Sequence, residues 1–158
     1  MFEGCQRLEG SIVLSDGFPE RTNFSSIIVI AGNVGGGGYS GDPLSLEGLD
    51  SLEVVEGSLA FVEDNLVDYT GVPNLRSVGG LSARGVPELR DFRGLENLTE
   101  VGGTLTITRN PKVESLEGLE RLQHVRGDVL IGDNPLLPPE DVETLLRRVT
   151  VDGEVNVW

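Results

Sequence analysis

Apolar residues recur along the chain with a fixed period and alternate with polar residues inside each period. The leucines that lead successive repeats are spaced 23, 23 and 24 residues apart: Leu52, Leu75, Leu98 and Leu122. The apolar positions coincide when three ten-residue segments are superposed: Leu52–Phe61, Leu98–Ile107 and Leu122–Ile131. Self-similarity at such a period is the signature of a repeat architecture, in which each unit buries its apolar side only against its neighbours.

Each repeat predicts a short strand, a corner and a turn. An L-x-x-V segment is followed by a glycine, which marks the corner, and then by an alternating apolar-polar run typical of a strand with one buried face. The second half reads N-P-x-V-x-S-L-x-G-L, as in Asn110–Leu119, and predicts a turn followed by another apolar edge. We therefore expect a mainly β solenoid of stacked coils.

The repeat extends toward both ends in weaker form. We match Leu8–Leu14 with Val55–Phe61, Ile28–Asn33 with Leu105–Asn110, and Val151–Val157 with Val125–Ile131. This alignment predicts about seven coils of 22–24 residues in one domain spanning residues 1–158.

Two segments depart from the repeat. The span from Ile30 to Leu46 is about seven residues longer than the corresponding span from Ile107 to Leu116. The extra length lies in residues 33–42, which contain the four glycines at 35–38 and predict a Gly-rich insertion loop that carries Tyr39. Residues 138–148 begin with prolines and acids, space their apolar residues by three and four, and finish with arginines, which predicts a short capping helix over the open end. Val149–Val157 is expected to return as a last strand.

Charge and composition narrow the function. Twenty-six Asp and Glu against twelve Lys and Arg give a formal net charge of -14, which opposes binding to nucleic acid or to anionic lipid. The chain contains no run of about 18 apolar residues, so membrane insertion is not predicted. The single Cys5 and the single His124 leave no Cys/His metal set and no catalytic relay. We expect no cofactor, no metal and no catalytic residue, and we expect the Cys5 thiol to be buried in the first coil.

The phrases Leu95–Pro111 and Gly132–Pro138 resemble the receptor L-domain family, a leucine-rich right-handed β-helix found in insulin and epidermal-growth-factor receptors and widely in bacterial surface proteins. The bacterial members are the most similar. The resemblance implies non-catalytic binding of a protein or glycan, and a location outside the cytoplasm or at the cell surface. Because Leu, Gly and Asn are common residues, an ordinary leucine-rich repeat stays open as an alternative. Family members often carry a cysteine near each end, whereas this chain has Cys5 alone and no recognisable signal segment, so a cytoplasmic location also stays open.

The strands predict a candidate partner surface, because residues between inward-facing positions must point outward. The outward positions are, coil by coil, Val13, Val29, Ala60, Ser82, Thr106, Leu130 and Asn156, and two residues further on Ser15, Ala31, Val62, Arg84, Thr108, Gly132 and Trp158. Arg84 alone carries charge among them. An exposed flat face low in charge favours a partner-binding role for Val29, Ala60, Val62, Ser82, Arg84, Thr106, Thr108 and Leu130. Tyr39 on the Gly-rich loop is a further candidate for contact with the partner. The alternative is that short side chains simply fit a sheet.

Other patterns favour structural roles. Asn33, Asp64, Asn110 and Asn134 follow the strand and are interpreted as a ladder that caps successive coils. The glycine run lacks the Gly-Lys-Ser/Thr of a phosphate loop, and the acids lack a calcium-binding rhythm. The leading hypothesis is a binding module. The alternatives are a structural module that self-associates through its coil ends and, less favoured, a polysaccharide-active β-helix enzyme.

Overall fold

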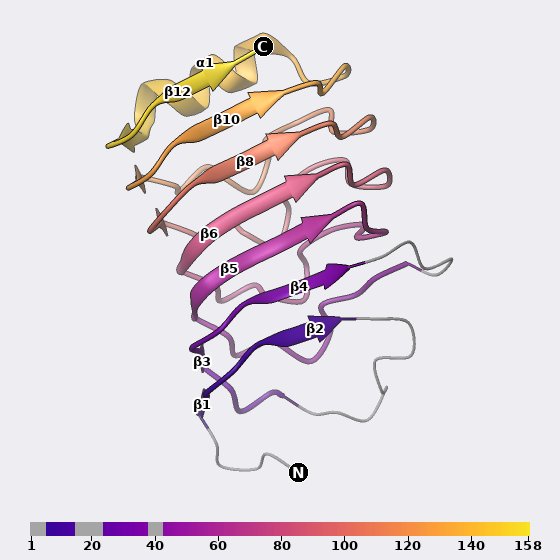
Figure 1. The fold of residues 1–158 in the computed structure, drawn as a ribbon, viewed down its shortest axis with the longest axis vertical. Coiled ribbons are helices and arrows are strands. Elements are labelled where there is room, and N and C mark those ends of the chain that lie inside the picture. Colours follow the sequence, from indigo (N-terminus) through magenta and orange to yellow (C-terminus); the bar gives the residue numbers. More distant parts are fainter. Residues whose placement is uncertain (1–5, 15–23, 38–42) are drawn as a thin grey trace.

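The computed structural model describes residues 6–14, 24–37 and 43–158 and has the architecture of a β-solenoid of about six turns (Figure 1). Every strand pair is parallel, and the coils stack along the long axis with the described N-terminal residues at one end and Trp158 at the other. The predicted stack of about seven coils is close to this count. Seven strands mark the successive coils on one side: β2, β4, β5, β6, β8, β10 and β12.

These strands form the wider of two strips of sheet, here called the broad strip. Its members are β2 (Ile12–Leu14), β4 (Val34–Gly37), the second parts of β5 (Val54–Val62) and β6 (Ser77–Arg84), β8 (Leu105–Thr108), β10 (Val129–Gly132) and β12 (Val155–Val157). The narrow strip contains β1 (Arg7–Leu8), β3 (Val29–Ile30), the first parts of β5 and β6, β7 (Glu100–Val101), β9 (His124–Val125) and β11 (Thr150–Val151). A corner joins the strips in each coil, and in β5 and β6 it lies at a register shift between Val55 and Ser58.

The third side of each coil has no strand and is built from paired turns. In the motif at Phe92–Leu98, the Leu95 N–H donates to the Phe92 carbonyl and the Leu98 N–H donates to the Leu95 carbonyl. Gly94 adopts a φ of 106°, which glycine reaches without the steric cost that a Cβ brings. A Cβ at Gly94 would also overlap the Tyr69 carbonyl of the preceding coil. The motif, which reads Phe92-Arg93-Gly94-Leu95 here and L-x-G-L in the coils at 46–49 and 116–119, therefore encodes both the turn and the close approach of successive coils.

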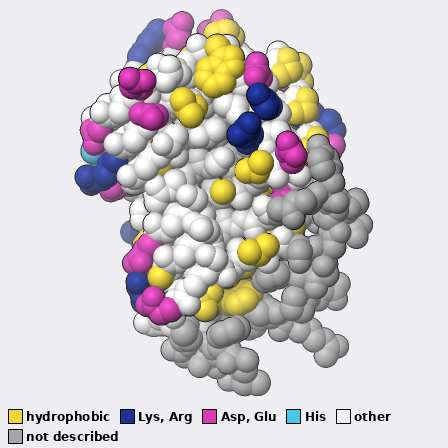
Figure 2. Space-filling model, in the orientation of Figure 1, with side chains coloured by type: hydrophobic (Ala, Val, Ile, Leu, Met, Phe, Trp, Pro, Cys, Tyr) yellow, Lys and Arg dark blue, Asp and Glu magenta, His cyan; other side chains and the backbone are white. Residues whose placement is uncertain are grey.

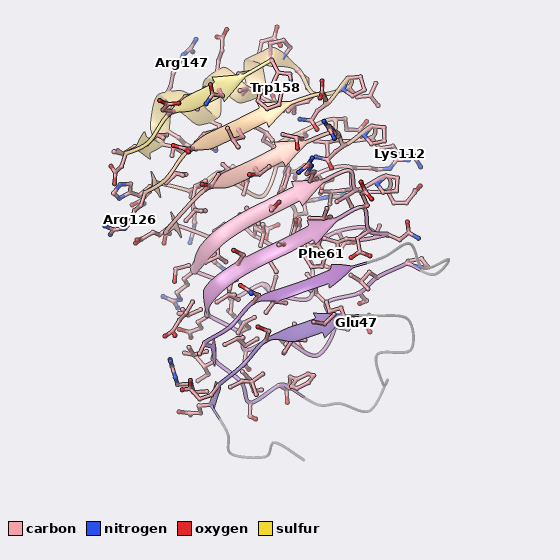
Figure 3. The ribbon with its side chains drawn as sticks, in the orientation of Figure 1. Glu47, Phe61, Lys112, Arg126, Arg147 and Trp158 are labelled. Atoms are coloured by element: carbon pink, nitrogen blue, oxygen red, sulfur yellow. The ribbon has the colours of Figure 1, made fainter. Side chains whose placement is uncertain are left out.

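The core is one continuous column of buried apolar side chains between the three sides. Its largest members form an aromatic cluster in neighbouring coils. The rings of Tyr69 and Phe92 are stacked with centroids 5.8 Å apart, and the edge of Phe61 meets Tyr69 at 5.9 Å. Phe61, labelled on β5 in Figure 3, points inward from the broad strip. The alternation along β5 is thus the one expected from the sequence.

The predicted helix is present as α1 (Pro139–Arg148), with Glu140 and Asp141 in its first turn and two arginines in its last. Acids near the N-terminus and cations near the C-terminus complement the helix dipole. Val142 and Leu145 are buried. Asp141 accepts from the Leu116 N–H at 3.4 Å, and Arg148 donates to the Leu119 carbonyl at 2.8 Å. The helix therefore covers the third side of the last coil, and the chain then returns as two strands, β11 and β12, rather than one.

The sequence alignment of the second coil was wrong. Ile30 pairs with Val55 on the narrow strip, and Val34 pairs with Leu59 on the broad strip, so Ile28–Asn33 does not match Leu105–Asn110. The rungs that begin at Ile12, Val34, Leu59, Leu81, Leu105, Val129 and Val155 are 22, 25, 22, 24, 24 and 26 residues apart. The true register is therefore regular through this region.

The prediction of a loop over residues 33–42 was also wrong in its first half. Gly35 pairs with Val13 on one side and with Ala60 on the other, which makes these glycines part of strand β4. Backbone hydrogen bonds to two neighbouring strands hold them extended in spite of their intrinsic freedom. Residues 38–42, with Tyr39, lie outside the described residues, as does Cys5.

Candidate functional site

The outward positions of the broad strip form one straight row across all coils. By register this outer row consists of Val13, Gly35, Ala60, Ser82, Thr106, Leu130 and Asn156. Their inward neighbours Leu59, Leu81 and Leu105 are at most 1% exposed, which confirms the predicted alternation. Val13 is 67% exposed, Asn156 is exposed, and the members between them are half-buried.

The outer row carries no charged side chain in the described residues. Figure 2 shows this face as a broad area of backbone and small polar side chains, with charged side chains at its margins. In Figure 3, Arg126 and Lys112 lie at opposite margins, away from the middle of the strip. Short side chains leave the strip flat, so a partner would meet hydroxyl groups, small apolar groups and the exposed parts of Leu130 and Val13.

Val29, predicted for this face, does not lie on it. It belongs to β3 on the narrow strip, in register with Arg7 and Val54. The error follows from the alignment of the second coil, because the residue that takes this place in the outer row is Gly35. The structure does bring together Ala60, Ser82, Thr106 and Leu130, as expected.

The second outward row ends the strands and is more varied. Val62 is 43% exposed and Arg84 is exposed, but Thr108 is only 7% exposed, so its predicted role as an accessible contact was wrong. Thr108 stands in register between Arg84 and Gly132, and the Trp158 ring lies directly on Gly132. A short side chain in such a row is shielded by its longer neighbours.

Arg84 differs from the other cations. Among the described residues, every other Lys or Arg side chain has an ion pair or a hydrogen bond, whereas the Arg84 guanidinium has neither. Guanidinium groups bind carboxylates in a bidentate geometry. An unengaged arginine at the margin of an uncharged face is therefore equipped to receive an anionic group of a partner.

The strands end at a repeated left-handed position. Glu63, Arg109 and Asp133 have φ values of 52°, 60° and 55°, and Gly85 takes the same place in the coil between Glu63 and Arg109. L residues with side chains rarely adopt this conformation. The left-handed residue turns the chain away from the broad strip at the same position in each of these coils, so the strip has a straight margin.

Amide side chains hold that margin, as the ladder hypothesis predicted. Asn110 is fully buried, accepts from the Val86 N–H at 2.9 Å and donates to the Ala83 carbonyl at 3.0 Å. Asn134 repeats the pattern one coil later by donating to the Ile107 carbonyl at 2.8 Å and accepting from the Asn110 N–H. The ladder satisfies backbone groups that the turn leaves unpaired, which is a structural role.

Asn33 was wrongly assigned to this ladder. It precedes β4 and lies at the corner between the strips, where its side-chain carbonyl accepts from the Ser58 N–H at 2.8 Å. Its own N–H donates to the Ser11 hydroxyl at 2.9 Å. Asn33 was misplaced for the same reason as Val29, namely the wrong alignment of the second coil.

The narrow strip carries charged side chains that pair with one another. Ion pairs link neighbouring coils at Arg126–Glu100, 2.5 Å, and span two coils at Arg7–Glu56, 2.7 Å. A hydrogen bond of 2.9 Å joins the His124 ring to the Asp152 carboxylate of the next coil. The hydrogen bond from Arg7 lowers the pKa of the Glu56 carboxyl, and the Glu100 carboxylate raises the pKa of Arg126. These charges satisfy one another, in contrast to Arg84.

One surface depression has no signal in the sequence. An open polar depression of about 440 Å³ lies beside the narrow strip and is lined by Gln6, Ser25, Ser51, Glu53 and Asn74, among others. Its residues come from separate coils and share no motif, so no local pattern could have indicated it. The described residues contain no cluster of three or more His, Cys, Asp or Glu arranged to hold a metal ion. Within the same ranges, no helix is long and apolar enough to cross a membrane.

Comparisons with known proteins add no relative: no family model, no curated protein and no solved structure matches this chain.

Proposed function

We propose that this chain is a non-enzymatic recognition module of receptor L-domain type, which binds a protein or glycan at the cell surface through the outer row of the broad strip. The observation that carries the proposal is the absence of charge from the described outer row in a chain in which 24% of residues are charged. Association surfaces are depleted of charge at their centre because an unpaired charge is costly to desolvate.

The flatness of the face supports a partner that is itself extended. The row crosses every coil, and its middle members offer the hydroxyl groups of Ser82 and Thr106 beside the apolar groups of Ala60 and Leu130. A sugar ring or a protein strand presents the same mixture of hydroxyl or amide groups and apolar patches. Arg84 at the margin supplies the charged contact, so the partner carries a carboxylate or similar anion where it meets β6.

The non-catalytic part of the proposal has its own support. Polysaccharide-cleaving sites need acids placed together to remove or donate a proton. The outer row has none, and Arg84 stands alone as the charged residue of the second row within the described ranges. The cell-surface part follows from the family resemblance.

The test is a capture experiment on the folded protein. Wild-type chain and the double variant Thr106→Arg/Leu130→Arg are used as bait for lysate and envelope fractions of the source cell and for a glycan array. The matched control is Ser77→Arg/Thr150→Arg, which adds the same charge to the narrow strip. Circular dichroism and thermal unfolding establish that all three proteins fold.

A partner held by wild type and the control but lost by Thr106→Arg/Leu130→Arg supports the proposal. Retention by the outer-row variant together with loss by the control would move the site to the narrow strip and overturn it. Unfolding of the outer-row variant would show that these side chains face the core, which would also overturn it. An Arg84→Ala variant tests the anionic contact, because its effect on affinity should shrink as salt concentration rises.

A further inference from the structure

Charged side chains line the margin at which the strands of the broad strip end, and they are here called the charged rim. Each of four successive coils contributes one of them: Glu63, Arg84, Arg109 and Asp133. At this margin the Glu63 N–H donates to the Arg84 carbonyl at 2.8 Å, and the Arg109 N–H donates to the Gly132 carbonyl at 3.1 Å. Figure 2 shows basic side chains beside an acidic one at this side of the face. Along the stack, the charges follow the order acid, base, base, acid.

The two arginines of the rim are little used within the molecule. Arg84 has no ion pair and no hydrogen bond among the described residues, although Glu63 is its backbone neighbour in the preceding coil. The Arg109 Nε lies 3.8 Å from the Asp133 Oδ2, which is too long for a hydrogen bond. Both arginines lie in inner coils, with β5 on one side and β10 on the other. Their guanidinium groups therefore have donors available for a partner.

The backbone gives an independent reason to look for an external role. Glu63 and Arg109 adopt φ values of 52° and 60°, a left-handed conformation that is costly for a residue with a Cβ. Gly85 takes the same position in the coil between them with a φ of 63°, so the fold accepts glycine there. Strained residues cluster at functional sites. A charged side chain at a position where glycine would relieve the strain is explained by a contact outside the turn.

We propose that the broad strip binds a protein of net positive charge, which places acidic side chains against Arg84 and Arg109 and basic side chains against Glu63 and Asp133. This inference rests on the proposed function, because the same face binds the partner, and it commits the partner to the protein class. The outer row then forms the uncharged centre of the contact, and the charged rim forms one edge of it. Such a centre with a polar rim is the usual anatomy of protein–protein interfaces.

The order of the charges favours a protein over a glycan. Successive coils are about 4.8 Å apart, so the complementary order of base, acid, acid, base extends over roughly 14 Å. A polypeptide carries side chains of both signs at fixed places, whereas an acidic polysaccharide carries one sign and would be repelled by Glu63 and Asp133. The net charge of -14 adds a long-range field that attracts a basic partner.

The test selects binders from a display library of random peptides at neutral pH and low salt. The folded wild-type chain is compared with the rim variant Arg84→Glu/Arg109→Glu, in which the two basic charges are reversed. The matched control is Arg76→Glu/Arg147→Glu, which changes the net charge equally at side chains that lie outside the broad strip and are 68% and 76% exposed. Circular dichroism and thermal unfolding establish that all variants fold.

We expect wild type and the control to select peptides of net positive charge in which acids lie between basic residues. The rim variant should lose these peptides and select others that carry bases at the central places. A synthetic peptide with the wild-type consensus, followed by fluorescence anisotropy, should bind the rim variant at least about tenfold more weakly and the control within about twofold, because like charges in contact are costly.

Arg109→Gly separates the rim contact from the stability of the turn. Binding of the consensus peptide should weaken by about two- to fivefold, the range of an exposed ion pair. The midpoint of thermal unfolding should stay the same or rise, because relief of the left-handed conformation offsets the added freedom of the unfolded chain. A lower midpoint with unchanged affinity would assign Arg109 to the turn and overturn its role in the rim.

Failure of this inference is distinguishable from failure of the proposed function. No enrichment on wild type, a consensus without acids, or equal loss by the rim variant and the control each overturns the inference, since the last reflects net charge alone. A glycan that binds wild type but not Thr106→Arg/Leu130→Arg, with no peptide enriched, overturns this inference and leaves the proposed function intact. Selected peptides that bind Thr106→Arg/Leu130→Arg as well as wild type would place the contact away from the outer row and overturn both.

Discussion

Replacing Tyr69 by Phe should make the protein more stable. The Tyr69 side chain is fully buried, and no described residue hydrogen-bonds its hydroxyl group. A buried hydroxyl without a partner lowers stability by about 1–3 kcal/mol relative to its hydrated state. The ring itself contributes through its stack on Phe92 and its edge contact with Phe61, and Phe keeps both.

The expected gain in stability is the cost of the buried hydroxyl group minus the cost of the space that its removal leaves. Removing one oxygen leaves roughly 10 Å³ of space, which at about 24 cal/mol per Å³ costs about 0.2 kcal/mol. Tyr69→Phe should therefore raise the free energy of unfolding by about 1–2 kcal/mol and the midpoint temperature by about 2–8 °C. Urea unfolding followed by circular dichroism measures the first quantity, and Tyr69→Leu serves as the control that loses the ring and should be less stable.

The pH dependence gives an independent check. Burial raises the pKa of Tyr69, so the folded state keeps the phenol neutral while the unfolded chain ionises near its ordinary value of 10.0. The unfolded state then binds fewer protons, and this contribution to stability, present below pH 10, is lost as the pH rises above it. The advantage of Tyr69→Phe should widen above pH 10. A Phe variant that is less stable than wild type, with no widening, would refute the inference that the hydroxyl lacks a partner.

Two further substitutions test the solenoid itself. Leu105→Ala should lower the free energy of unfolding by about 2–4 kcal/mol, because it leaves a cavity in a fully buried column, whereas Thr106→Ala on the outward side should change it by less than about 0.5 kcal/mol; equal effects in urea unfolding would mean that the alternation is inverted. Asn110→Ala should lower it by about 2–4 kcal/mol, because the Val86 N–H and the Ala83 carbonyl lose their buried partner, and a loss below about 0.5 kcal/mol would exclude the ladder as a stabilising element.

Much of the fold was predictable because the relevant signals are local in sequence. The 23–24-residue period, the alternation in Leu105–Thr108 and the charge pattern of residues 138–148 each report which side of an element faces the core. The L-x-G-L motif predicted a turn for a reason seen in the structure, since Gly118 needs both its positive φ and its missing Cβ. The central part of the candidate face, from Ala60 to Leu130, followed from the same alternation.

The tertiary structure decided what depends on neighbours one coil away. The burial of Thr108 depends on side chains in the adjacent coils. The clearest case is β4. A glycine run carries no side-chain alternation, so the sequence contains no strand signal there, and the extended conformation of Gly35 and Gly36 comes from pairing with residues 22 and 25 positions away. Where a strand has side chains that alternate between apolar and polar, the sequence alone determined its position and its inward face. Strand β4 lacks such side chains, and its conformation was determined by backbone hydrogen bonds to the strands of neighbouring coils.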